Sequence, residues 1–245
     1  MNDDDIDQLL SRLKLRRIRT ILAEHLAEAE ASGPSYQVFL TRLLREEHHA
    51  QQTRFLENRI KRAKLPESWP LETFPWDKQP GIRQAQIEQL GTLNFIGRAT
   101  NVVFIGSTGV GKTGLASGIL LKALFAGHRA LFMKAQDLFD DLFRSLADHS
   151  SRKLLNKIAR VDVLLIDEMG YLNLRPEQSN IFFKLMEERY TRRQCTLITT
   201  NLEYDEWYGF LGQKPMVSAL LDRLRHRCVT VRIEGPSLRT PSLHD

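Results

Sequence analysis

Apolar residues recur every three or four positions along the first part of the chain, and this spacing predicts helices. One amphipathic stretch covers residues 5–31 and ends at the helix-breaking run Ser32-Gly33-Pro34-Ser35. A second covers about 36–64 and ends in a basic run. Two helices enclose only a small core. We therefore expect residues 1–65 to form a helical domain that associates with a second copy or docks on a partner protein.

Prolines and aromatic residues dominate the next segment, residues 66–81. Dense prolines disfavour a helix, whereas aromatic side chains favour burial. The segment is predicted to be a linker docked on the domain that follows. Its prolines and aromatic residues are Pro66, Trp69, Pro70, Phe74, Pro75, Trp76 and Pro80.

From about residue 100 the pattern changes to short apolar runs that alternate with amphipathic stretches. Near-continuously apolar runs are typical of strands covered on both faces. The runs predict strands at 101–105, 130–133, 162–166, 195–199 and 228–233, and helices at about 112–126, 136–147, 152–159, 175–193 and 216–226. This alternation predicts an α/β domain over 82–245, in which helices sandwich a parallel five-stranded sheet.

Composition removes several classes of protein. The 245 residues are 42% hydrophobic and 27% charged, a globular balance, and the apolar runs are far shorter than the ~20 residues of a membrane span. The first residues are acidic and polar, unlike a secretory signal. The two cysteines, Cys195 and Cys228, lie in predicted strands and exclude a disulfide framework or a cysteine-rich metal site. We expect a cytoplasmic setting.

Charge is unevenly distributed. Residues 1–80 contain 13 basic and 13 acidic residues, so the whole net charge of +5 lies beyond residue 80. A basic α/β domain permits a polyanionic partner such as DNA, although a solvated basic surface explains the same excess.

The strongest motif follows the strand predicted at 101–105. The sequence GSTGVGKT matches G-x-x-x-x-G-K-[ST], in which backbone N–H groups surround phosphate oxygens, the lysine reaches the β- and γ-phosphates and the hydroxyl binds Mg²⁺. A plain glycine-rich turn is disfavoured by the flanking strand and helix. The predicted ATP-binding residues are Gly106, Ser107, Thr108, Gly109, Val110, Gly111, Lys112 and Thr113.

The strand predicted at 162–166 ends in two acids, Asp167 and Glu168. A buried strand brings such acids to the edge of the sheet where the phosphate loop lies. Asp167 is predicted to hold Mg²⁺ together with Thr113, and Glu168 to orient and deprotonate the attacking water. The chain is therefore predicted to hydrolyse ATP.

Three further polar residues are candidates for the reaction. Asn201 follows the strand predicted at 195–199, and its amide offers a donor and an acceptor to the attacking water, although Asn also forms turns. Arg223 precedes the last strand and Arg239 follows it. Arg223 can stabilise phosphate charge in a neighbouring subunit, and Arg239 can do so in its own subunit. Each can also be an ordinary surface arginine.

Together these motifs resemble an AAA+ ATPase, and more specifically the IstB-type transposition helper ATPases, relatives of the DnaC-type helicase loaders. The resemblance spans nearly the whole chain. It rests on IDEMGYL at 166–172, ERY at 188–190, TTNL at 199–202, LDRL at 221–224, the G-x-S-x-R spacing of Gly235, Ser237 and Arg239, LLREE at 43–47 and KLP at 64–66. One departure is Leu238, where the family usually has an aromatic residue.

The resemblance implies a strand order of 5-1-4-3-2, ATP-dependent self-assembly, and binding of duplex DNA in concert with a transposase. It assigns Arg223 as an arginine finger that acts on a neighbouring subunit and Arg239 as a second sensor. A helicase loader is the alternative function, and a nucleotide-gated scaffold that hardly hydrolyses ATP is a third. Glu168 argues against the third, because a switch without hydrolysis needs no base.

Three expectations concern the edges of the site. Only 12 residues follow Ile233, so the helical lid of typical AAA+ proteins is expected to be reduced or absent, and hydrolysis to depend on assembly. Adenine contacts are expected at Gly81 and Ile82, from their position. DNA contacts, with a solvated helix face as the alternative, are expected at Arg144, Arg152, Lys153, Lys157 and Arg160.

Overall fold

The computed structural model describes residues 3–66, 69–170, 172–212 and 214–239. The chain divides into two compact units, Met1–Asn58 and Arg59–Asp245. The division lies inside helix α3 (Tyr36–Ala63), earlier than the residue 65 that the sequence predicted. The reason is that the last turn of α3 belongs to the second unit, where Ala63 is fully buried and Ile60 packs against the core.

The first unit consists of α1 (Asp3–Arg12), α2 (Arg16–Ser32) and most of α3. The single helix expected over 5–31 is wrong: the helix breaks at Leu13–Leu15, where Lys14 adopts a left-handed backbone conformation with φ of 59°. The core of this unit is small, with Ile18, Ile21 and Leu43 buried. Large apolar side chains remain exposed along all three helices and at the break between α1 and α2, namely Leu9, Leu13, Leu26, Tyr36, Val38, Leu40, Leu44 and Phe55.

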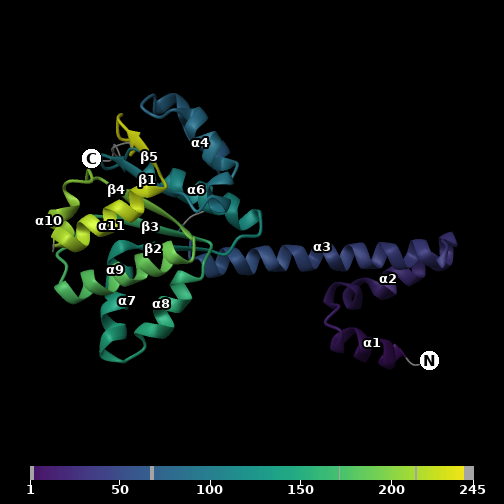
Figure 1. Ribbon diagram of the computed structural model, residues 1–245. Coiled ribbons are helices and arrows are strands. Elements are labelled where there is room, and N and C mark those ends of the chain that lie inside the picture. The colour runs from purple at the N-terminus through teal and green to yellow at the C-terminus, as the bar shows by residue number, and fades with distance from the viewer. Residues whose placement is uncertain (1–2, 67–68, 171, 213, 240–245) are drawn as a thin grey trace, which may run out of the picture. The chain divides into compact units, whose positions relative to one another are not determined.

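The second unit is built on one parallel sheet (Figure 1). Its strands lie in the order β2-β3-β4-β1-β5, which confirms the order predicted from the family resemblance. Each apolar run of the sequence became a strand: β1 (Asn101–Gly106), β2 (Ala130–Lys134), β3 (Val163–Met169), β4 (Cys195–Thr200) and β5 (Cys228–Ile233).

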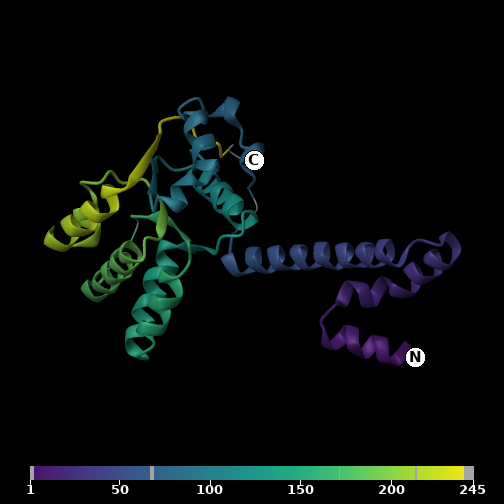
Figure 2. The same cartoon turned by 45° about the vertical axis from the view of Figure 1, so that its right-hand side comes forward.

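Helices cover both faces of the sheet (Figure 1 and Figure 2). Alternate strand residues face opposite layers. Val102 and Phe104 join the core under one layer, α4 (Gln84–Gly91), α5 (Asn94–Gly97) and α6 (Lys112–Phe125). Val103 and Ile105 face the other layer, which comprises α7 (Ala135–Ala147), α8 (Ser151–Ala159), α9 (Pro176–Thr191), α10 (Trp207–Leu211) and α11 (Lys214–His226). The sequence did not predict α4, α5 or α10.

Two short 3₁₀ turns, Leu71–Thr73 and Trp76–Lys78, interrupt the proline-rich segment. Leu71 and Phe74 are buried beside α6, so the described part of the segment is docked on the second unit. After β5 the described residues 234–239 form no helix. Along the described parts of the chain, no helix combines the length and apolar character that crossing a membrane requires.

Candidate nucleotide site

The phosphate loop connects β1 to α6 at the carboxyl edge of the sheet. Gly109 and Gly111 have φ of 86° and 97°, a conformation that favours glycine. The Lys112 Nζ donates to the carbonyl oxygens of Gly106 at 2.8 Å and Ser107 at 2.7 Å, so the ammonium lies within the loop. Burial lowers the pKa of this ammonium, and the Asp167 carboxyl opposes the shift. The loop therefore presents one cation and the start of a helix to an anion.

Asp167 is brought to the loop by β3. Its Oδ1 accepts from the Thr113 hydroxyl at 2.9 Å and from the Thr199 hydroxyl at 2.5 Å. Burial raises the pKa of the Asp167 carboxyl, and the two hydroxyl donors oppose this shift. The Thr113 hydroxyl and the Asp167 carboxylate, which the sequence predicted to bind Mg²⁺, thus lie side by side. Oxygen ligands of this kind suit Mg²⁺.

Glu168 points away from the buried side of β3 because its backbone is left-handed, with φ of 60°. Its N–H donates to the Thr199 Oγ1 at 3.0 Å, so one hydroxyl holds both acids of the motif. The Glu168 side chain is 53% exposed, and its carboxylate lies 3.5 Å from the Lys134 Nζ at the end of β2. An exposed carboxylate beside the phosphate loop has the access to water that a general base needs.

Asn201 follows β4 at the same edge. Its Oδ1 is buried, with no hydrogen-bond partner among the described residues. The hydroxyl of its neighbour Thr200 is engaged, because it donates to the Met169 carbonyl and accepts from the Leu202 N–H. The free acceptor of Asn201 favours it over Thr200 as the polar group for a water or phosphate.

The two candidate arginines lie at different places. Arg239 is exposed and lies near the phosphate loop, where its charge adds to the burial that lowers the pKa of Lys112. Arg223 lies in α11, at the opposite edge of the sheet. The residue after it, Leu224, accepts from the Asn101 side chain at 3.1 Å, and Asn101 begins β1. The phosphate loop begins at the other end of β1, about 17 Å away at ~3.3 Å per residue, so Arg223 is too far from its own loop to contact a phosphate there.

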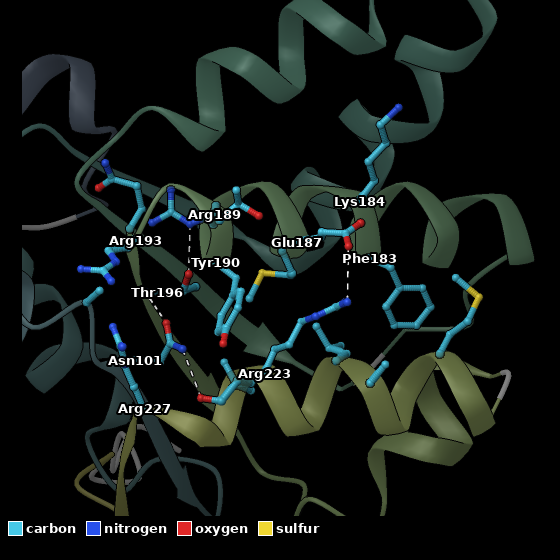
Figure 3. A pocket seen from close by; sticks show the side chains of 18 of the residues that line it. Asn101, Phe183, Lys184, Glu187, Arg189, Tyr190, Arg193, Thr196, Arg223 and Arg227 are labelled. Atoms are coloured by element: carbon cyan, nitrogen blue, oxygen red, sulfur yellow. Dashed lines mark hydrogen bonds and ion pairs between the residues drawn. The ribbon is translucent and has the colours of Figure 1, made fainter.

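Arg223 lies instead on a groove of about 710 Å³ between α9 and α11 (Figure 3). Its guanidinium lies 3.4 Å from the Glu187 carboxylate, and Lys184, Arg193 and Arg227 also line the groove. The groove is therefore cationic and faces away from the phosphate loop of the same chain.

Comparison with known proteins decides the family. The family described as "IstB-like ATP binding protein" matches residues 8–243. The chain belongs to this family. It is 34% identical over 235 residues to a protein of Pseudomonas aeruginosa named as an ATP-binding protein of insertion sequence IS21, covering 96% of this chain and 88% of that protein. A relative from Geobacillus stearothermophilus, named for ATP binding in IS5376, is 36% identical over 211 residues, with 86% and 84% covered.

Solved structures share the fold of this IstB-like chain. The DnaC helicase loader has a TM-score of 0.53 and 22% identity, covering 61% of this chain and 87% of that chain. Aquifex aeolicus DnaA bound to AMPPCP has a TM-score of 0.58 and 22% identity, covering 70% and 51%. The second unit therefore has the AAA+ fold of these proteins.

The residues predicted for adenine are packed against other parts of the IstB-like chain. A Cβ on Gly81 would lie 1.6 Å from the Glu234 carbonyl oxygen, and the Ile82 side chain is buried in the core beside α6. An adenine contact at these two positions stays a prediction.

The residues predicted for DNA lie apart from the nucleotide site. Leu155 and Ile158 hold α8 to the core, whereas the cations of this segment, Arg152, Lys153, Lys157 and Arg160, are exposed. Arg144, on α7, lies 3.5 Å from the Asp141 carboxylate, so its charge is partly balanced within its own helix. A DNA contact at these positions stays a prediction.

Three residues of the site were not predicted from the sequence of the IstB-like chain. Thr199 holds both acids, Lys134 pairs with Glu168, and Gln79 donates to the carbonyl of Val110 in the phosphate loop. For the first two a signal existed, since each ends a strand that neighbours β3 in the predicted order. Gln79 carried no such signal, because its partners are backbone atoms.

Proposed function

We propose that this IstB-like chain is a Mg²⁺-dependent ATPase that assembles on duplex DNA and assists a transposase in choosing or remodelling its target. The observation that carries the proposal is the network of Thr113, Asp167, Thr199 and Glu168 beside the phosphate loop. A chain that only bound nucleotide would need the loop but not a second, exposed carboxylate at this edge. The proposed setting is the cytoplasm.

The protein's own residues divide the work of hydrolysis. Lys112 exchanges its two loop carbonyls for the phosphates, since an ammonium favours charged acceptors over neutral ones. Thr113 and Asp167 would hold Mg²⁺, which would balance charge on the phosphates when bound. Glu168 accepts a proton from the attacking water, and Asn201 positions that water through its side-chain amide.

Arg223 completes the site of a neighbouring subunit. Its place at the far edge of the sheet supports this role, because it cannot reach the phosphates of its own chain. In a head-to-tail assembly the far edge of one subunit meets the nucleotide edge of the next. An arginine supplied in this way balances charge that develops on the phosphate.

DNA binding is proposed for Arg144 of α7 and for the exposed cations in and just after α8, namely Arg152, Lys153, Lys157 and Arg160. These side chains would contact phosphates rather than base edges, which gives affinity with little sequence preference. The relatives from Pseudomonas and Geobacillus are named for insertion sequences, and this supports a role in transposition. The likeness to the DnaC loader keeps a helicase loader as the second candidate.

The test is ATP hydrolysis with Mg²⁺, measured without DNA, with duplex DNA and with single-stranded DNA. We expect duplex DNA to stimulate hydrolysis, and Glu168→Gln to abolish hydrolysis while ATP still binds. Stimulation by single strands alone would favour the helicase loader. ATP binding without hydrolysis under all three conditions would contradict the proposed ATPase.

A further inference from the structure

Two distant segments meet on the outer side of the phosphate loop. The Leu238 N–H donates to the Gly109 carbonyl at 2.9 Å, and a Cβ on Gly109 would lie 2.1 Å from the Ser237 hydroxyl. A Cβ on Gly111 would lie 2.8 Å from the Phe74 ring and 3.1 Å from Leu238. The proline-rich segment and the segment after β5 are therefore both in contact with the loop.

Gln79 connects these segments. Its Nε2 donates to the Val110 carbonyl of the loop at 3.2 Å and to the Pro236 carbonyl at 3.0 Å. The side chain is 1% exposed, and its Oε1 has no hydrogen-bond partner among the described residues. Both bonds thus come from one amide nitrogen, which uses one hydrogen for each carbonyl.

The segments around Gln79 and Pro236 are packed so closely that two glycines in them have no room for a side chain. A Cβ on Gly235 would lie 1.7 Å from the Gln79 Oε1, and a Cβ on Gly81 would lie 1.6 Å from the Glu234 carbonyl oxygen. The two segments therefore pass each other at backbone distance. A clamp built this closely fixes the path of the chain over Glu234–Pro236.

Arg239 follows three residues beyond the clamped Pro236 carbonyl. The Arg239 N–H donates to the Ser237 hydroxyl at 3.2 Å, and the N–H of the preceding residue, Leu238, donates to the Gly109 carbonyl of the loop. Arg239 lies near Lys112, so the two cations repel each other until an anion lies between them. The position of the Arg239 guanidinium decides how much a terminal phosphate gains from it.

We propose that Gln79 is a positioning residue that holds Arg239 over the phosphate loop and so makes the chain discriminate ATP from ADP. This inference rests on the proposed ATPase function, and it assigns to Gln79 no contact with nucleotide. In this proposal the clamp places the Arg239 guanidinium where the γ-phosphate would bind. Loss of the clamp therefore weakens the binding of ATP more than the binding of ADP.

The experiment measures the affinities of Mg-ATP and Mg-ADP by calorimetry, in the full chain carrying Glu168→Gln to prevent turnover. Gln79→Met keeps the length of the side chain and removes both donors. We expect the affinity for ATP to fall about tenfold, as for one lost charged hydrogen bond, while ADP changes by less than about twofold. Gln79→Asn keeps the amide but is one carbon shorter, and it is expected to lose the same preference.

Two comparisons separate positioning from a general structural effect. Gln86→Met is the matched control, because the Gln86 Nε2 donates to the Thr230 carbonyl on β5 at 3.4 Å, away from the loop, and it should leave both affinities unchanged. The second comparison is a double variant. If Gln79 acts only through Arg239, the chain with both Arg239→Ala and Gln79→Met should bind ATP no more weakly than the chain with Arg239→Ala alone.

The outcomes are distinct. Additive losses in the double variant, or equal weakening of ATP and ADP by Gln79→Met, would overturn the positioning role while leaving the ATPase proposal intact. If the chain that carries only Glu168→Gln bound ATP and ADP with equal affinity, the role of Arg239 would be overturned, and with it this inference. Chains that bind neither nucleotide would overturn the proposed function itself.

Discussion

Thr199 shows how one residue organises the chemistry of the whole edge. Its hydroxyl donates to the Asp167 carboxylate and accepts from the Glu168 N–H, and its side chain is 1% exposed. One donor thereby favours the ionised form of a buried carboxylate, while one acceptor holds a left-handed backbone in place.

The first prediction concerns Thr199→Val, which keeps the shape and removes the hydroxyl. The proposed role of Asp167 in holding Mg²⁺ requires its ionised form. Burial raises the pKa of Asp167, and the Thr199 bond opposes that rise. Removing the bond therefore raises the pKa further, and the acid limb of the pH–rate profile should move to higher pH. ATP turnover across pH tests this. Thr199→Ser keeps the hydroxyl and should leave the limb in place, and an unmoved limb in Thr199→Val would contradict the account.

At the scale of elements, the sequence predicted the strands better than the helices. A buried strand needs only a short apolar run, and each predicted run lies in its strand to within a few residues. The residue that takes the left-handed conformation at the break in the first helix is Lys14. No glycine or proline stands there, so no residue type in the sequence signals the break. Likewise α10 has five residues, too few for a helical period to show.

The sequence also did not predict which charged side chain would be fully buried in the core. Arg189, in the ERY stretch, is fully buried in α9 and its guanidinium donates to the Thr196 hydroxyl and to the carbonyls of Ile158, Val161 and Cys195. Burial lowers the pKa of Arg189 to about 10. These partners are mainly backbone oxygens, so no residue pattern could identify them. The stretch that marks the family thus includes a residue that ties α9 to the sheet and to the end of α8.

The second prediction concerns Glu47, which caps another element. Its carboxylate is buried and accepts from the N–H groups of Arg17 and Ile18 at the start of α2 and from Arg54. Burial alone would raise its pKa, but these donors lower it overall. Its stabilisation is therefore complete above the unfolded pKa of about 4.3 and is lost as pH falls through the lower folded value.

Glu47→Gln should consequently destabilise the chain by about 1–2 kcal/mol at neutral pH, since charged hydrogen bonds become neutral ones. Urea unfolding followed by circular dichroism, at neutral pH and below pH 4, measures the effect. The difference between the two proteins should shrink in acid. The exposed acid Glu57→Gln is the control, and a difference that grows in acid would refute the capping role.

At the scale of the whole molecule, the second unit holds the groups of the proposed function at separate positions. The nucleotide edge carries the phosphate loop, the opposite edge carries Arg223, and the exposed cations of α8 lie apart from the nucleotide site. The sequence singled out each of these groups, but only the strand order and the pairing of Asn101 with Leu224 reveal that Arg223 is remote from its own loop.

The third prediction concerns DNA. Replacing Lys153 and Lys157 together with alanine should reduce the slope of log affinity against log salt by about 1.8, if each lysine neutralises one phosphate of a duplex. Titrations of labelled duplex at several salt concentrations give the slope. The matched control replaces Arg83 and Arg98, two exposed cations elsewhere in the second unit, and should leave the slope unchanged. An unchanged slope in the lysine variant would remove α8 from the DNA interface.

The central claim is that the phosphate loop of one subunit is served by Arg223 of another. The decisive measurement is ATP turnover on duplex DNA by Arg223→Ala alone, Glu168→Gln alone and their mixture. Each variant alone should be inactive. An equal mixture should recover about a quarter of the wild-type rate, because random head-to-tail contacts pair an intact Glu168 with an intact Arg223 in one junction of four. A mixture as inactive as its components, or full activity in Arg223→Ala alone, would contradict the account.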